Sequence, residues 1–112
     1  MENNFDEYAR IRIMNTQSEI IDFLQNNRKL LLEKYHVTKI GIFGSFARNE
    51  QKENSDVDLL IELEEGTQNI YDIKASLKQF LSASFNRSVD IAREKYLKPY
   101  AREVILKDTL YV

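Results

Sequence analysis

The feature that most constrains the fold is an apolar run, DVDLLIEL at residues 56–63, that carries two aspartates near its start. The run has the aliphatic composition of a strand packed in a protein interior. Residues two apart in a strand point to the same face, so Asp56 and Asp58 lie side by side while Val57 and Leu59 face the other way. The fold must therefore bury one face of this strand and accommodate two adjacent carboxylates on the other.

The remaining patterns predict helices and strands in alternation. Thr16 and Glu19 form a capping box at the start of a predicted helix. The expected helices cover residues 17–34, 46–51, 69–85 and 98–108, and the expected strands cover 37–43, 56–63 and 87–92. The order α-β-α-β-α-β-α predicts an α+β (α/β) fold in which helices flank a small mixed sheet.

Length and composition narrow the class of protein. The 112 residues fit one domain, 1–112, of which residues 1–15 form an N-terminal arm without a clear period. The net charge of −2 means that the protein has no excess of positive charge to attract a nucleic-acid backbone, so no direct nucleic-acid binding is expected. Cysteine is absent, and no apolar stretch approaches the roughly 18 residues of a membrane span. We therefore expect a cytoplasmic protein that does not insert into a membrane.

The two adjacent aspartates predict a metal site. Like charges at this spacing repel, raise one pKa and are costly to bury without a cation. No lysine or arginine lies within the strand to supply that cation. Mg²⁺ takes oxygen ligands and is typically held by one or two carboxylates together with substrate phosphates. Gly44 and Ser45, placed where a strand ends and a helix begins, offer backbone N–H groups and a hydroxyl to those phosphates.

Asp90 supplies a third carboxylate, again between apolar neighbours in a short strand. If that strand lies beside residues 56–63, three acids converge at one edge of the sheet. With two metal ions, such a triad can activate a hydroxyl and stabilise a leaving pyrophosphate. Asp90 is then the candidate general base for the attacking hydroxyl. The pattern thus predicts phosphoryl or nucleotidyl transfer.

The motif Gly44-Ser45-Phe46-Ala47-Arg48, followed after a spacer by Ser55-Asp56-Val57-Asp58-Leu59-Leu60, resembles the signature of DNA polymerase β-like nucleotidyltransferases in their minimal (MNT) form. The closing LKPYAREVILKDTLYV also resembles the end of MNT antitoxins. The resemblance implies that Gly44 and Ser45 bind the triphosphate, that Asp56, Asp58 and Asp90 are catalytic and hold the metals, and that Arg48 steadies the phosphates. Many relatives have glycine where this chain has Asn49, a residue that tolerates left-handed backbone.

The resemblance further implies an antitoxin of a type VII-like HEPN/MNT toxin-antitoxin system. Such an enzyme would use ATP and Mg²⁺, two ions being expected, to move AMP to a tyrosine of a HEPN ribonuclease toxin. It would form a hetero-oligomer with that toxin. Two alternatives remain open: an antitoxin that blocks the toxin by binding alone, and a nucleotidyltransferase with a small-molecule acceptor. The missing second domain argues against the small molecule.

Residues outside the motif have simpler interpretations. His36, the only histidine, is expected to be structural or exposed rather than catalytic. Arg48 could equally pair with Glu50 or Glu53 as a solvated side chain. The C-terminal tyrosines are interpreted as packing residues that could also face a partner; they are Tyr96, Tyr100 and Tyr111.

Overall fold

The core of the protein is a mixed four-stranded sheet. The computed structural model describes residues 13–112, and residues 1–12 of the predicted arm lie outside this range. The strand order is β3-β2-β1-β4. Strand β1 (Val37–Phe43) is antiparallel to both β2 (Val57–Leu63) and β4 (Leu110–Tyr111), whereas β3 (Val89–Arg93) is parallel to β2. The expected helix-flanked mixed sheet is confirmed.

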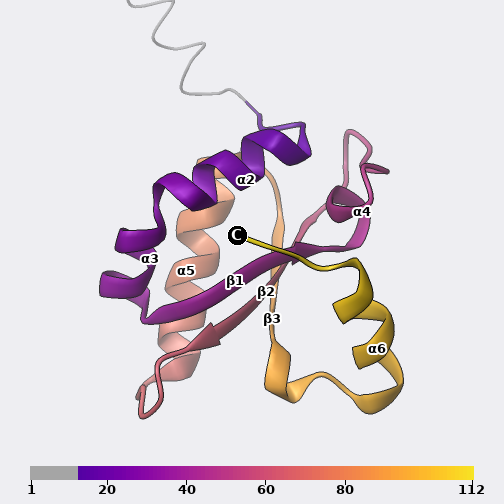
Figure 1. Ribbon diagram of the computed structural model, residues 1–112. Helices are drawn as coiled ribbons and strands as arrows, with labels where there is room; N and C mark the ends of the chain where they lie inside the picture. The colour runs from indigo at the N-terminus through magenta and orange to yellow at the C-terminus, as the bar shows by residue number, and fades with distance from the viewer. Residues whose placement is uncertain (1–12) are drawn as a thin grey trace, which may run out of the picture.

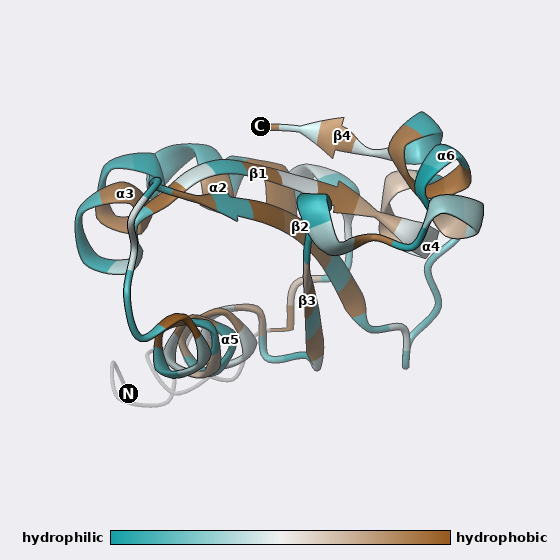
Figure 2. Ribbon diagram, turned by 90° about the horizontal axis from the view of Figure 1, so that it is seen from below, coloured by the Kyte–Doolittle hydropathy of each residue, from teal (hydrophilic) through white to brown (hydrophobic). Residues whose placement is uncertain are grey.

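Three helices cover one face of this sheet: α2 (Gln17–Asn26), α3 (Arg28–Tyr35) and α5 (Ile70–Phe85) (Figure 1). Helix α5 buries Leu77, Leu81 and Phe85, which are spaced four residues apart and therefore share one side of the helix. The inward residues of β1 and β2 complete the core, and brown apolar stretches mark these strands in Figure 2. No helix within residues 13–112 is long and apolar enough to cross a membrane.

The helix predicted over residues 17–34 is two helices. Its capping box at Thr16 is present, but Asn27 leaves helical geometry at φ −112° and ψ 15°. The Asn27 side chain donates to the Phe23 carbonyl at 2.8 Å, which stabilises the break by satisfying a carboxyl-terminal acceptor of α2. Helix α3 then ends at Tyr35, and His36 follows with a left-handed φ of 61° that turns the chain into β1. As expected for a structural role, the His36 ring pairs with Glu64 at 3.0 Å.

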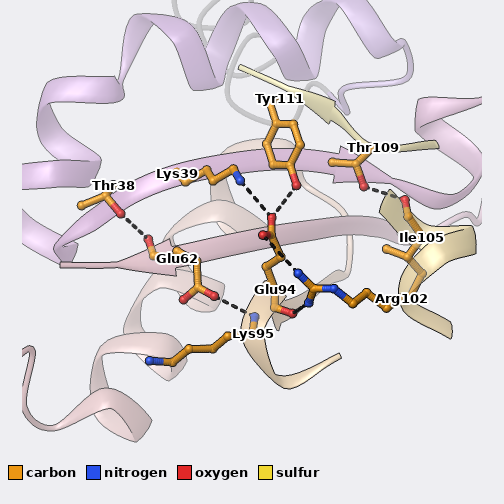
Figure 3. Close-up of polar contacts among 9 residues, drawn as sticks. All are labelled: Thr38, Lys39, Glu62, Glu94, Lys95, Arg102, Ile105, Thr109 and Tyr111. Carbon is orange, nitrogen blue, oxygen red and sulfur yellow. Dashed lines mark hydrogen bonds and ion pairs between the residues drawn. The ribbon is translucent and has the colours of Figure 1, made fainter. Parts of the chain in front are cut away.

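The C-terminal region contains elements that the sequence pattern did not predict. A 3₁₀ turn, η1 (Glu94–Tyr96), precedes α6 (Pro99–Asp108), and β4 follows as an added edge strand. The Glu94 carboxylate holds these pieces to the sheet by accepting from Tyr111 Oη and from Lys39 Nζ, the latter at 3.1 Å (Figure 3). The hydrogen bond from Tyr111 lowers the pKa of Glu94 most, and the hydrogen bond from Lys39 lowers it further.

The interpretation of the C-terminal tyrosines as packing residues is wrong for two of them. Tyr96 is 69% exposed and Tyr100 is 80% exposed. Helix α6 buries none of its residues fully, so its tyrosine has no core to enter. Tyr111 is half-exposed and contributes through its hydrogen bond to Glu94 instead.

Candidate active site

Gly44 lies at the junction of β1 with the short helix α4 (Gly44–Ala47), which begins two residues earlier than predicted and ends at Ala47. Its φ is +73°, a left-handed value that glycine adopts without strain. A Cβ at Gly44 would overlap Oδ2 of Asp58, because Asp58 is the register partner of Phe43 on the neighbouring strand. The glycine therefore brings the backbone of the Gly-Ser turn directly against Asp58.

The three predicted acids lie together. Asp58 in β2 is in register with Asp90 in the parallel strand β3, and Asp56 precedes β2 by one residue. Burial, together with the negative charges of Asp90 and Asp56, raises the pKa of Asp58 to about 6, and the positive charge of Arg48 opposes this rise. The condition that Asp90 lie on a strand beside Asp58 is met. The side chains form a concentrated negative site at the start of β2 and β3.

The donor set fits a hard divalent cation that also contacts a substrate. Within residues 13–112, no group of three or more histidine, cysteine or acidic side chains is arranged to hold a metal ion by itself. Mg²⁺ does not require such a cage, since one or two carboxylates with waters and substrate phosphates are its usual ligands in proteins. The repulsion that Asp56 and Asp90 impose on Asp58 is the kind that a cation relieves. The geometry thus suits an ion that arrives with a nucleotide.

Ser45 and Arg48 flank this negative site on the side of α4. Ser45 is partly buried at the second position of the helix, and its carbonyl accepts from Glu50 N at 2.9 Å. The Arg48 side chain is 44% exposed and pairs with Glu50 at 3.0 Å and with Asp108 at 3.4 Å. Arg48 therefore pairs with Glu50, one of the two glutamates that the sequence offered as partners for a solvated side chain. Asn49 adopts the left-handed φ of 57° that its position was expected to require.

Sequence patterns missed Arg87, the residue that fixes the loop before Asp56. Its guanidinium donates at 2.9 Å to the carbonyls of both Glu53 and Ser55, and its Nε donates at 2.7 Å to the carbonyl of Met14. These acceptors are 32 to 73 positions away in sequence, so no local pattern could reveal them. Arg87 holds the loop that delivers Asp56 to the site.

The raised pKa of Asp58 predicts a stability that depends on pH. Without metal or nucleotide, we expect Asp58→Asn to stabilise the protein by about 1 kcal/mol at about pH 7.5, after reduction for solvent screening, and to change it little at about pH 4. The folded protein binds this proton more tightly than the unfolded chain, whose aspartate keeps a pKa near 3.8. The stability from that proton is present below about pH 4 and is lost as the pH rises through about 6.

Thermal unfolding in a chelator at both pH values measures this effect, and about 1 kcal/mol corresponds to about 4–8 °C for a domain of this size. Asp22→Asn, on the exposed side of α2, is a control that removes one negative charge elsewhere. An Asp58→Asn protein that melts below the wild type at the higher pH would contradict the sign of this prediction.

Comparisons with known proteins agree with this geometry. The family model described as "Nucleotidyltransferase domain" matches residues 21–112. A Methanocaldococcus jannaschii protein named "Putative protein adenylyltransferase MJ0128" is 42% identical over 88% of this chain and all of its own length. "Protein adenylyltransferase MntA" of Thermococcus cleftensis is 36% identical over 88% of this chain and 98% of its own.

Among solved structures, one described as a "putative minimal nucleotidyltransferase" has a TM-score of 0.72 and 30% identity, covering 86% of this chain and 95% of that one. A toxin-antitoxin structure with AMP-PNP has a TM-score of 0.61 at 21% identity, covers 78% of this chain and 70% of that one, and supports the fold alone. The chain belongs to the nucleotidyltransferase domain family, in its minimal form. It is an enzyme of the nucleotidyl-transfer class, as the motif predicted.

Proposed function

We propose that this chain is an antitoxin that transfers AMP from ATP to a tyrosine hydroxyl of a HEPN-domain toxin and so neutralises it. The observation that carries the proposal is the row formed by Gly44, directly after β1, Asp58 on β2 and Asp90 on β3. Similarity to proteins named protein adenylyltransferases supports a protein acceptor. We choose a toxin as that acceptor because fold neighbours of this chain are described as toxin-antitoxin structures.

The proposed reaction forms one bond and breaks one. The tyrosine oxygen attacks the α-phosphorus of ATP, the bond between that phosphorus and the bridging oxygen breaks, and pyrophosphate leaves with the electron pair. Asp90 accepts the hydroxyl proton. Gly44 and Ser45 bind the triphosphate, and Arg48 contributes positive charge near the leaving group. The reaction takes place in the cytoplasm, where ATP is abundant, within a hetero-oligomer of enzyme and toxin.

Mg²⁺, as one or two ions held by Asp56, Asp58 and Asp90, would neutralise charge on the phosphate oxygens. The three aspartates would supply the ligands, and the contact of Asp58 with Gly44, together with the register of Asp58 with Asp90, supports this assignment. Asp58 is mainly ionised above its pKa of about 6, so it is available as a ligand at neutral pH.

The direct test incubates the purified chain with its cognate toxin and ATP labelled on the α-phosphate. We expect label on the toxin, mass spectrometry that places AMP on a tyrosine, and loss of both when a chelator is added. Mg²⁺ with ATP should also raise the thermal midpoint of the enzyme, because a ligand that binds only the folded state stabilises it. Neutralisation of the toxin without any AMP label on it would contradict the transferase mechanism.

A further inference from the structure

A polar groove of about 630 Å³ opens beside the acids, between α5 and the start of β3. Asp56 and Asp90 line it on the side of the sheet. Helix α5 contributes Lys78 and Ser82, which are four residues apart and form a short stripe along the helix, and the capping residue Asn86 follows at its carboxyl end. This stripe runs next to the buried residues of α5, so the helix that anchors the core also forms a wall of the groove.

Of the two basic residues that line the groove, Lys78 is the one whose charged group is available to a ligand. Arg87 also lines the groove, but its guanidinium is occupied by the carbonyls of Glu53 and Ser55 and by the side chain of Asn15 at 2.7 Å. Lys78 is exposed, and within residues 13–112 it makes no ion pair. An unpaired ammonium group on a polar wall favours a ligand that carries negative charge.

The strand order indicates from which side the attacking hydroxyl reaches the phosphorus. Gly44 directly follows β1, Asp58 lies in β2, and Asp90 lies in β3, the outer strand on that side. The groove lies at Asp90, on the opposite side of Asp58 from Gly44. In phosphoryl transfer, the attacking and leaving oxygens are roughly in line on opposite sides of the phosphorus. With the leaving pyrophosphate at Gly44, the attacking hydroxyl must approach from the groove.

We propose that this groove binds the acceptor segment of the protein substrate, and that Lys78 pairs with an acidic residue next to the modified side chain. The inference rests on the proposed AMP transfer, which places pyrophosphate at Gly44. Ser82 offers its hydroxyl for a hydrogen bond to the backbone of an irregular segment. The groove thereby selects a hydroxyl-bearing residue in an acidic context and directs it toward Asp90.

The test compares Lys78→Glu with Lys74→Glu, a matched control one turn earlier on α5 that does not line the groove. Lys78→Glu should raise the KM for the toxin, and its Kd measured without ATP, by about tenfold or more, because like charges now meet in the groove. Its affinity for AMP-PNP with Mg²⁺ should stay within about twofold of the wild type. Lys74→Glu should leave all three values unchanged.

Two results would overturn the inference. An unchanged KM and Kd for the toxin in Lys78→Glu would remove Lys78 from acceptor binding. An equal loss of AMP-PNP affinity would assign the groove to the nucleotide. Failure of the proposed function is distinguishable, because the wild type would then leave the toxin unlabelled, while the Kd for the toxin measured without ATP would still report on the groove.

Discussion

The double variant Asp56→Asn, Asp58→Asn is expected to lose AMP transfer by a factor of about 10³ or more while it remains folded. Both substitutions keep side-chain shape and remove the negative charge that a divalent cation requires. Burial and the charges of Asp90 and Asp56 raise the pKa of Asp58, so removing its charge relieves desolvation and repulsion and costs the fold nothing at neutral pH. The measurement is the initial rate of label transfer, accompanied by the thermal midpoint.

Glu62→Gln is the matched control for this variant. Glu62 is a carboxylate on the same strand and, four residues from Asp58, on the same face, but it accepts from Lys95 N at 2.8 Å and lies toward the other end of β2. We expect its transfer rate to stay within about twofold of the wild type. A double variant that transfers AMP as fast as this control would contradict the assignment of Asp56 and Asp58.

The same variant separates catalysis from binding as the means of neutralisation. If the chain neutralises the toxin by transfer, cells carrying the double variant should lose protection in step with the loss of label. A double variant that protects cells as well as the wild type, while transferring no AMP, would identify an antitoxin that acts by association. The catalytic proposal would then fail even though the enzyme class holds.

Much of the site could be predicted from sequence because its geometry is local. The period of two in a strand places Asp56 and Asp58 together wherever that strand lies. The position of Gly44 between a strand and a helix likewise needs only neighbouring residues. Asp90 required one further condition, that its strand lie beside β2, and the parallel register of Asp58 with Asp90 meets it.

The unpredicted features depend on contacts between distant segments. Strand β4 has two residues and is defined by pairing with β1, so its own sequence carries almost no signal. Arg87 acts on carbonyls of residues brought near it only by the completed fold. The break at Asn27 was missed because the apolar spacing continues across it, from Leu24 to Leu31, as it would in one helix.

Gly44→Ala is the second substitution with a large expected effect, a fall in AMP transfer of about 10² or more. The new methyl group would occupy the space of Asp58 Oδ2, so either the carboxylate must rotate away or the turn must move. Both responses separate the proposed phosphate site from the acids, and small displacements of reacting groups are costly in catalysis. Steady-state kinetics and AMP-PNP binding measure the loss.

Gly66→Ala separates the clash from backbone strain. Gly66 has a similar φ of +82°, but an added Cβ there meets nothing within 4 Å. Both variants should therefore lose about 1 kcal/mol of stability from the left-handed backbone. Only Gly44→Ala should lose transfer, because only its methyl group meets Asp58. Equal activity in the two variants would mean that the contact between the Gly-Ser turn and Asp58 does not position the reaction.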